Sequence, residues 1–345
     1  NEQRFPKLWG FTVQQELADK YNIDLDKITS YEELEPYLAK IKQHEPDLIP
    51  WYTDNKGAGG LLYPELEGWD PVNSYGAGIK FDDGSLSVFN RYDTDEYRAA
   101  IKLARKWHEA GYSATTPASP GDATAKWTAG QFAFQAGQFA PTNPQIYPFA
   151  TTGKSLVKHP VITTDSISSA LLAINQATKS PETVLSFVEQ LHTDKELFNL
   201  LCFGIEGKHW VYTDKELDVV GLPAGQQPSA SKWNPNMDWQ FGSQFNAHYR
   251  TKADAEAKRW EVERKLNESS AQSKALGFTF DSTKLQTQVA TTSATLSEYL
   301  PQLQAGLVPY PQGYDAMMSK LKASGADKLI DEAGTQLSAW KKANA

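Results

Sequence analysis

The sequence predicts an α/β protein with a mainly parallel sheet and about two globular units. Segments with strand-like alternation are separated along the chain by segments with helical periodicity, an order that packs helices against a sheet. A chain of 345 residues with 40% hydrophobic and 22% charged side chains is too long for one core and too apolar to stay disordered.

The N-terminal third is predicted to hold helices, then loops, then a long helix. Residues 11–20 have helical periodicity, and Ser30 and Glu33 have the spacing of a capping box before a second helix. Residues 51–89 are rich in Gly, Pro and Asp, which favours loops and short strands. A strongly amphipathic helix follows from Asp93 to the stop at Gly111. The apolar faces of the two later helices are Leu34, Leu38 and Ile41, and then Tyr97, Ala100, Ile101, Ala104 and Trp107.

The middle of the chain alternates between the two periodicities. Residues 125–130 predict a helical turn with a Gly break, and 131–137 a half-buried strand. Residues 167–175 predict a second, buried strand, followed by a helix with Ser180 as N-cap and Pro181 at its first position. The next helix is capped within 193–196 and ends at Gly204. A charged helix over 253–266 and a helical stretch from Thr291 to the end complete the prediction.

Composition excludes several function classes. The net charge is −8 and the basic residues are scattered, so the chain has no cationic patch for nucleic acid. The single cysteine, Cys202, forms no internal disulfide and leaves the compartment open. The longest apolar runs are far shorter than a membrane span. We therefore expect no nucleic-acid partner and no membrane-crossing helix.

The motif search predicts no catalytic residue, metal or cofactor. The six histidines form no zinc pattern, and the nucleophile elbow, the phosphate-binding loop and the dinucleotide fingerprint are missing from the sequence. A pair of catalytic carboxylates stays open at this level, because 42 acidic residues offer many pairs that only geometry distinguishes.

Aromatic side chains provide the positive signal. The chain has 10 Trp, 15 Tyr and 15 Phe, more indole than a core normally uses, so some rings should be exposed. Residues 204–210 (Gly-Ile-Glu-Gly-Lys-His-Trp) predict a tight loop that presents Glu206, His209 and Trp210, although a capped turn with surface polar groups explains them equally well. Trp233 and Trp239 lie among prolines and amides with neither helical nor strand period. Indoles beside Asn, Gln, Asp and His favour a carbohydrate ligand over peptide or lipid.

Several segments, in order along the chain, resemble extracellular solute-binding proteins of ABC importers, specifically the LipO-like lipoprotein subgroup of family 1. The segments are residues 18–24, 31–35, 41–46, 179–182, 204–210 and 277–280. They are spread over nearly the whole chain, and the loop at Gly204 is the most specific of them.

The resemblance implies a helix-rich, two-lobed clamshell of the type 2 periplasmic-binding fold. Residues 1–160 would then be the first part of lobe two, 161–245 the returning part of lobe one, and 246–345 mostly lobe two. Since residues 1–6 lack an initiator Met and any signal-peptide pattern, we expect either a removed targeting segment or a longer parent chain, with the start of lobe one outside this sequence.

The resemblance also implies site residues. Glu2 would lie near the hinge, and Gln138 and Phe139 would follow a strand that contributes to the cleft in maltose-type binders. This chain has Phe where those proteins have Trp. With the aromatic signal, the predicted ligand-binding set is Glu2, Gln138, Phe139, Glu206, His209, Trp210, Trp233 and Trp239.

The expected function is non-enzymatic: binding an oligosaccharide and delivering it to the permease subunits of an ABC importer. We expect a monomer outside the cytoplasm, periplasmic or lipid-anchored through a segment not in this chain. A glycoside hydrolase or lyase would need facing carboxylates, and a peptide or amino-acid binder would need a charged clamp. If the lobe map holds, residues 167–175 and the helix from Pro181 should expose an apolar face, and lobe two should be the better packed unit.

Overall fold

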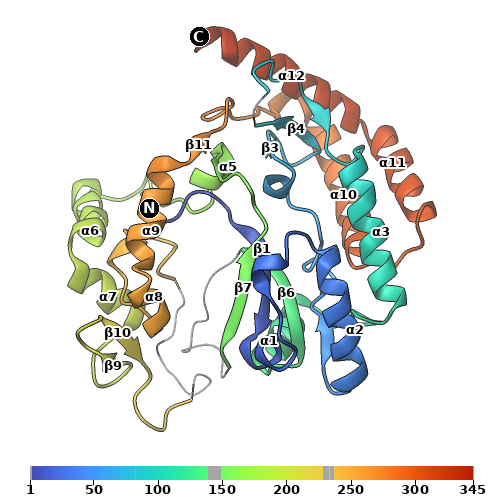
Figure 1. Ribbon diagram of the computed structural model, residues 1–345. Helices are drawn as coiled ribbons and strands as arrows, with labels where there is room; N and C mark the ends of the chain where they lie inside the picture. The colour runs from blue at the N-terminus through green and yellow to red at the C-terminus, as the bar shows by residue number, and fades with distance from the viewer. Residues whose placement is uncertain (1, 82, 139–148, 228–232, 234–236, 345) are drawn as a thin grey trace. The chain divides into compact units, whose positions relative to one another are not determined.

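The computed structural model describes residues 2–81, 83–138, 149–227, 233 and 237–344 (Figure 1). The chain divides into two compact units. Unit 1 consists of Asn1–Pro6, Ala140–Ala150 and Asp165–Ser270, and unit 2 of Lys7–Phe139, Thr151–Thr164 and Ala271–Ala345. The long segment of unit 1, Asp165–Ser270, includes α9 (Arg259–Ser269), which buries Trp260 in the same cluster as Phe198 and Phe203.

Unit 2 is built around a four-stranded sheet with the order β2-β6-β1-β7. Its strands are β1 (Trp9–Gln14), β2 (Ile49–Trp51), β6 (Phe132–Gln138) and β7 (Thr151–Ser155). β1 is antiparallel to both β6 and β7, and β2 with β6 is the parallel pair, so the prediction of a mainly parallel sheet is wrong for the described strands. The predicted helix over 11–20 is wrong in its first half, because Phe11 and Val13 alternate inward from a strand and only α1 (Gln15–Lys20) is helical.

Two smaller sheets also belong to unit 2. β3 (Trp69–Pro71), β4 (Ala77–Lys80) and β5 (Phe89–Asn90) form an antiparallel sheet, within the region predicted to hold loops and short strands. β8 (Val161–Ile162) pairs in parallel with β11 (Ala271–Gln272). The β8–β11 pair joins segments that are far apart in sequence, which only a tertiary structure reveals.

The helices of unit 2 follow the predicted apolar faces. In α2 (Glu35–His44) and the turn before it, Leu34, Leu38 and Ile41 are fully buried, and the Glu33 carboxylate accepts a hydrogen bond from Ser30 N at 3.2 Å. α3 (Asp95–Glu109) is capped by Thr94, and its predicted face packs inward up to the positive φ of Gly111. α4 (Pro120–Thr128) ends before Gly130, as predicted. The C-terminal prediction is confirmed by α10 (Gln286–Gln304), α11 (Gln312–Ser324) and α12 (Ala326–Ala343).

Unit 1 has a smaller core made from helices and one hairpin. Its elements are α6 (Pro181–Thr193), α7 (Lys195–Phe203), β9 (Val211–Asp214), β10 (Val219–Gly221), α8 (Lys252–Glu256) and α9. Asp194 caps α7 by accepting hydrogen bonds from the backbone N–H groups of the next turn, and the helix ends before Gly204 as predicted. The predicted charged helix is divided into α8 and α9, because Lys258 has a left-handed backbone conformation, with φ 50°.

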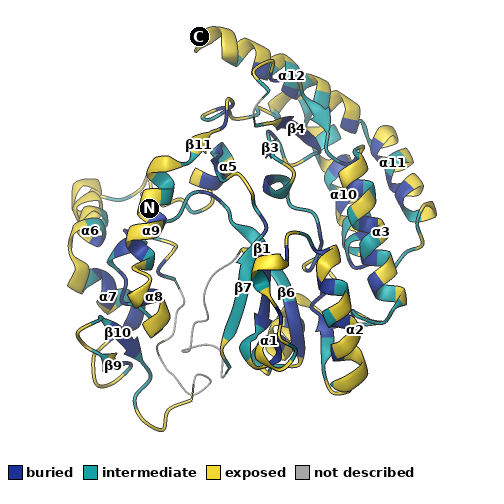
Figure 2. Cartoon of the chain, viewed as in Figure 1, coloured by how far each residue is buried: buried dark blue, intermediate teal, exposed yellow. Residues whose placement is uncertain are grey.

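The predicted strand at 167–175 is wrong, and the predicted apolar exposure is confirmed. α5 (Thr164–Ile167) is helical, residues 168–175 have neither strand nor helix structure, and α6 follows at Pro181. Without a neighbouring strand among the described residues, this apolar segment has no sheet to join. The exposed side chains, which lie on α6 and the segment before it (Figure 2), are Ile167, Leu171, Leu172, Ile174, Val184, Leu185 and Phe187.

Most of the tryptophan excess belongs to the core. Six of the 10 indoles are buried, and only Trp233 and Trp239 are exposed by more than a third. No helix in the described residues has both the length and the apolar character that crossing a bilayer requires.

Candidate functional site

The loop at 204–210 is tightly closed by its own hydrogen bonds. Ile205 O accepts hydrogen bonds from the backbone N–H groups of Lys208 and His209, and Trp210 O accepts one from Gly207 N at 2.7 Å. Gly204 and Gly207 have φ of +83° and +75°, in the left-handed region that favours glycine. The sequence prediction of a tight loop is therefore confirmed, and its exposed carboxylate, Glu206, extends into solvent.

His209 and Trp233 stack on each other beside this loop. Their ring centroids are 6.0 Å apart with 24° between the planes. His209 Nδ1 accepts a hydrogen bond from Ile205 N at 2.9 Å, and Trp233 Nε1 donates to Leu201 O at 3.2 Å. Trp233 is 39% exposed, so this indole is held at its edge while part of its surface remains open.

Trp210 lies in the core of unit 1. It is 6% exposed, its Nε1 donates to Gly204 O at 3.0 Å, and its ring packs against Tyr212 and His248. A side chain with its polar atom satisfied and its faces covered is not an open platform, so the assignment of Trp210 as a stacking residue is not supported by its position. Tyr212 is two residues away, but His248 comes from a later segment, and the local sequence carried no signal of that contact.

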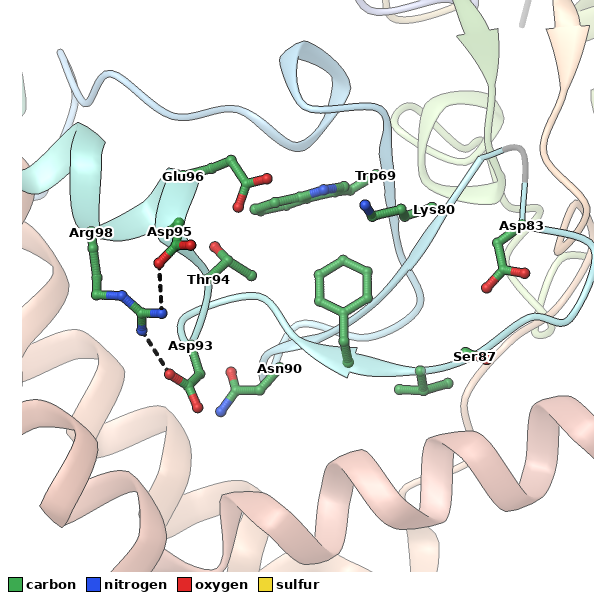
Figure 3. Close-up of a pocket in the computed structure, with 12 residues that line it drawn as sticks. Trp69, Lys80, Asp83, Ser87, Asn90, Asp93, Thr94, Asp95, Glu96 and Arg98 are labelled. Carbon is green, nitrogen blue, oxygen red and sulfur yellow. Dashed lines mark hydrogen bonds and ion pairs between the residues drawn. The ribbon is translucent and has the colours of Figure 1, made fainter.

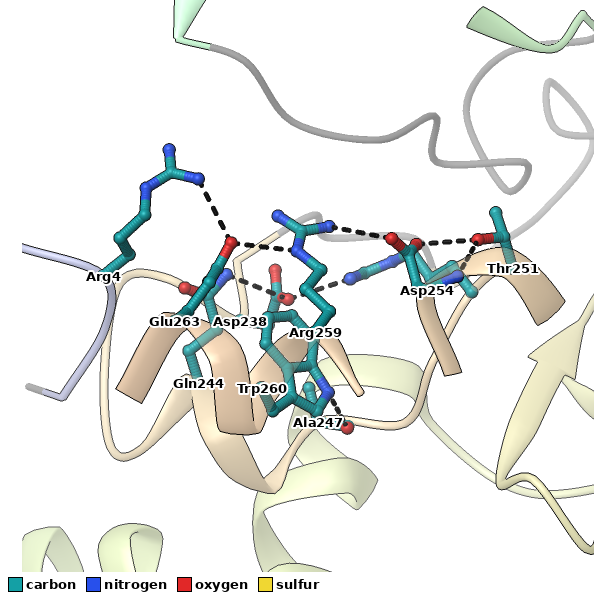
Figure 4. A network of polar contacts seen from close by, with 10 residues as sticks. Arg4, Asp238, Gln244, Ala247, Thr251, Asp254, Arg259, Trp260 and Glu263 are labelled. Atoms are coloured by element: carbon teal, nitrogen blue, oxygen red, sulfur yellow. Dashed lines mark hydrogen bonds and ion pairs between the residues drawn. The ribbon is translucent and has the colours of Figure 1, made fainter. Parts of the chain in front are cut away.

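Trp239 is 42% exposed and follows one of the most buried carboxylates of unit 1. Asp238 is 3% exposed and accepts hydrogen bonds from Arg250 Nη1 at 2.9 Å and from Gln244 Nε2 at 3.4 Å (Figure 4). Burial pushes the pKa of Asp238 upward, but the Arg250 charge and hydrogen bonds outweigh burial and lower it below its usual value. Asp238 therefore anchors the backbone next to the exposed indole.

A second set of ion pairs supports the same region of unit 1. Arg4 Nη1 contacts Glu263 Oε1 at 3.1 Å, and Arg259 bridges that carboxylate to Asp254 (Figure 4). Glu2 joins the segment after Trp239: its Oε2 accepts from Ser243 Oγ at 2.7 Å, and its backbone pairs with Gly242 and Gln244. Glu2 thus contacts residues 242–244, a few positions after Asp238 and Trp239, although it is far from them in sequence.

Gln138 belongs to unit 2, at the exposed end of β6. It lies opposite Trp9 in the β1–β6 pairing, and the Trp9 ring stacks on Tyr63 with centroids 3.8 Å apart. Trp9 and Tyr63 are half-buried aromatic residues that the sequence analysis did not select, because nothing local marks their stacking. Phe139 lies outside the described residues.

Each unit also contains an open pocket. The pocket of unit 1 has a volume of about 800 Å³ and is lined by Glu206, Trp210, Tyr212 and His248, with the exposed Leu200 and Ile205 at its wall. That of unit 2, about 630 Å³, lies beside Trp69 and Phe89 and has Lys80 and several acidic side chains around it (Figure 3). Both pockets combine aromatic rings with charged groups.

The pocket of unit 1 includes a polar group that the sequence analysis missed. His248 Nδ1 and Asp218 Oδ1 are 2.6 Å apart, and Lys195 Nζ contacts the other carboxylate oxygen at 2.8 Å. Burial raises the pKa of Asp218, but hydrogen bonds from His248 and Lys195 outweigh it and lower the pKa overall. Burial raises the pKa of Tyr212, as does the charge of Asp218. Because the Asp218 carboxylate is held between His248 and Lys195, the arrangement favours structural pairing over acid–base chemistry.

Within the described part of the chain, no three His, Cys, Asp or Glu side chains are grouped to hold a metal ion. Cys202 is buried, and burial raises the pKa of its thiol to about 12, so it is a poor nucleophile. The described site thus offers exposed indoles, an imidazole, amides, the exposed carboxylate of Glu206, and the carboxylates of Glu2 and Asp238, which already have partners. Such groups bind a neutral polar ligand by stacking and hydrogen bonding.

Comparisons with known proteins place this geometry in context. A family model described as a domain of unknown function, DUF3502, matches residues 274–342. A carbohydrate ABC transporter substrate-binding protein from Streptococcus pneumoniae serotype 4 is 26% identical over 341 residues, covering 94% of this chain and 65% of the relative. The chain therefore spans just under two thirds of that relative's length.

Solved structures share the fold. The N-glycan transport solute binding protein NgtS from Streptococcus pneumoniae matches with a TM-score of 0.81 at 21% identity, covering 99% of this chain and 74% of that chain. Its complex with Man5GlcNAc matches with a TM-score of 0.81 at 22% identity, covering 100% of this chain and 75% of that chain. An extracellular solute-binding protein from Bifidobacterium longum subsp. infantis has a TM-score of 0.57 at 13% identity, covering 99% of this chain and 75% of that chain. The chain has the α/β solute-binding-protein fold over nearly its full length.

Proposed function

We propose that this chain is a non-enzymatic carbohydrate-binding protein of an ABC importer, and that it binds an oligosaccharide of the N-glycan type for delivery to a permease. The observation that carries the proposal is the match of 99% of the chain to a solute-binding protein of N-glycan transport, with a TM-score of 0.81. The relative that is 26% identical also has a name that describes carbohydrate transport.

The chemistry of unit 1 supports a sugar ligand. Trp233 and Trp239 expose indole surface, and pyranose rings stack on such surfaces through their C–H groups. His209 and Glu206 lie on the loop beside Trp233 and can exchange hydrogen bonds with hydroxyl groups. In unit 2, Gln138 adds an exposed amide next to Trp9. These residues, with Glu2, are the proposed ligand-binding set.

The alternatives find less support in the same residues. A glycosidase needs one carboxylate free to act as an acid and another as a base or nucleophile. Asp238 instead forms an ion pair with Arg250, and Glu2 accepts a hydrogen bond from Ser243. A peptide binder needs charged groups that face the ligand termini, whereas Arg4, Arg250 and Arg259 are engaged in ion pairs within unit 1.

Three further features belong to the proposal. Membership of the LipO-like subgroup would place the protein outside the cytoplasm, in the periplasm or attached to the cell surface by a lipid. Unit 1 would correspond to lobe one and unit 2 to lobe two of the clamshell. We propose that the protein acts as a monomer and that the permease subunits are its protein partners.

Titration calorimetry with Man5GlcNAc, alongside a fructo-oligosaccharide as a control, tests the proposal. We expect saturable binding of the mannose-containing glycan, quenching of tryptophan fluorescence and a rise in melting temperature, since a ligand that binds only the folded state stabilises it. Mass spectrometry of the glycan after overnight incubation should show no cleavage. Heat changes indistinguishable from dilution across a broad glycan panel would contradict the proposal, and cleaved product would favour the hydrolase.

A further inference from the structure

Gly204 lies where a side chain would collide with two members of the proposed sugar site. A Cβ atom built on Gly204 would be 2.7 Å from Trp233 Cδ1 and 3.0 Å from His209 Cγ, closer than such atoms normally approach. The stacked arrangement of the two rings thus requires glycine at this position for a steric reason, in addition to its φ of +83°.

The hydrogen bond from Ile205 N fixes the tautomer of His209. Because Nδ1 accepts this bond at 2.9 Å, it carries no proton in the neutral imidazole, and the proton must be on Nε2. Among the described residues Nε2 has no hydrogen-bond partner, so Nε2–H is a directed donor. The backbone that supplies the Ile205 N–H is itself held, since Ile205 O accepts from His209 N at 2.9 Å. The donor is therefore oriented before any ligand arrives.

The indole is fixed from a different segment. Trp233 Nε1 donates to Leu201 O at the end of α7, and one ring face lies against His209. With 39% of Trp233 exposed, indole surface remains available to a ligand. A platform and a donor that are held by separate hydrogen bonds lose little conformational entropy on binding.

We propose that Gly204 is a positioning residue that holds His209 and Trp233 as one unit, and that this unit binds a single pyranose ring. The exposed indole surface stacks on the C–H groups of the sugar, and His209 Nε2–H donates to a hydroxyl or ring oxygen at its edge. The inference depends on the proposed carbohydrate function. To that function it adds Gly204 as the residue that determines the geometry of the His209–Trp233 pair, and the Nε2–H tautomer of His209 as the form that donates the hydrogen bond.

The loop contains a matched control for Gly204→Ala. Gly207 has a similar φ, +75°, but a Cβ there would meet no atom within 4 Å. Both substitutions place a side chain at a positive φ, and Gly204 also has a ψ of −150°, which adds backbone strain there; only Gly204→Ala displaces the two rings. By calorimetry with Man5GlcNAc we expect Gly204→Ala to weaken binding by about tenfold or more, and Gly207→Ala to change it by less than about threefold. Equal losses in both variants, or none in either, would overturn the positioning role.

A measurement without ligand separates this inference from the proposed function. The ¹⁵N chemical shifts of the His209 ring, assigned by comparison with His209→Gln, report the tautomer of the neutral imidazole. We expect the Nε2–H form in the wild-type protein and in Gly207→Ala, and a mixture of tautomers in Gly204→Ala. A wild-type protein with the Nδ1–H form would overturn the inference even if glycans bind. A wild-type protein that binds no glycan while keeping the Nε2–H form would refute the sugar role and the proposed function, but not the steric role of Gly204.

Discussion

Two amphipathic helices, α3 in unit 2 and α6 in unit 1, have similar sequence patterns and opposite environments. On α3, the apolar side chains of Tyr97, Ile101 and Trp107 are at most 3% exposed. On α6, Leu185 is 59% and Phe187 45% exposed, although the helix is rich in apolar residues. Periodicity thus predicts that a helix has an apolar face. It does not predict whether other residues of the described chain pack against that face.

The two units also differ in how their cores are stabilised. Three of the four hydrophobic clusters among the described residues belong to unit 2. Unit 1 has a single aromatic cluster and, beside it, the ion pairs that join Arg4, Glu263, Arg259 and Asp254. Unit 2 should therefore respond most to loss of apolar volume, and unit 1 to loss of charge.

The largest expected difference is the cost of truncating one aromatic side chain on each helix. Trp107 of α3 is 1% exposed and Phe187 of α6 is 45% exposed. We expect Trp107→Ala to lower the free energy of unfolding by about 3–5 kcal/mol and Phe187→Ala by less than about 1 kcal/mol. Urea denaturation followed by circular dichroism measures both values. Similar losses would mean that the α6 face is covered in solution.

A smaller effect should separate the exposed and buried indoles within unit 1. Trp239 is 42% exposed, whereas Trp260 is 7% exposed and donates to Ala247 O at 2.7 Å. We expect Trp239→Ala to weaken glycan binding by about 1–3 kcal/mol with little change in stability, as for aromatic residues at interfaces. Trp260→Ala should mainly lower the melting temperature. Calorimetry and thermal unfolding of both variants test this, and marked destabilisation by Trp239→Ala would show that its indole is structural.

Acidification should weaken unit 1 before unit 2. Burial pushes the pKa of both Asp238 and Asp218 upward, but Arg250 and Gln244 beside Asp238, and the hydrogen bonds from His248 and Lys195 to Asp218, outweigh burial and hold the pKa values below the usual 3.8. A carboxyl with a lowered folded-state pKa stabilises the fold above its unfolded pKa, and the contribution is lost as the pH falls through the folded value. Asp254 has the opposite effect on the pH dependence. Burial raises its pKa despite the charge of Arg259, so its protonation at low pH favours the folded state.

Hydrogen exchange of backbone amides at pH 5 and pH 3 measures this difference. We expect α7, which packs in the unit that contains these ion pairs, to lose protection earlier than α10 in unit 2. Asp238→Asn should reduce the pH dependence of α7, because it removes one titrating group. Simultaneous loss of protection in both helices would contradict the prediction that acid weakens unit 1 before unit 2.

The comparison also shows which features the sequence could predict. The helices α2, α3, α4 and α7 were predictable because caps, glycine stops and apolar faces are local signals. The sheet was not, since β1 pairs with β6 and β7, which follow more than 110 residues later, and strand pairing depends on such distant contacts. Residues 167–175 have a strand-like composition but have no partner strand among the described residues.

The candidate site was predictable where its signals are local, and not where it depends on distant contacts. The loop at Gly204 follows from two glycines after a helix, and the exposure of Trp233 and Trp239 agrees with their polar, aperiodic surroundings. Trp210 could not be distinguished from them, because its burial depends on Tyr212 and on His248, which returns from a later segment. The stacking of Trp9 on Tyr63 had no local signal either.

The smallest expected change concerns polar substitution on the exposed face of α6. Leu185 is 59% exposed, so Leu185→Lys should alter the free energy of unfolding of this chain by no more than about 0.5 kcal/mol. The same substitution interrupts the apolar surface that includes Leu172 and Phe187, and exposed surfaces of this kind promote association. We therefore expect lower binding of a hydrophobic fluorescent dye and less light scattering on concentration.

Ile101→Lys on α3, 3% exposed in the wild type, is the matched control and should unfold unit 2. If Leu185→Lys were as damaging as the control, α6 would be buried in solution and the contrast between the two helices would be lost.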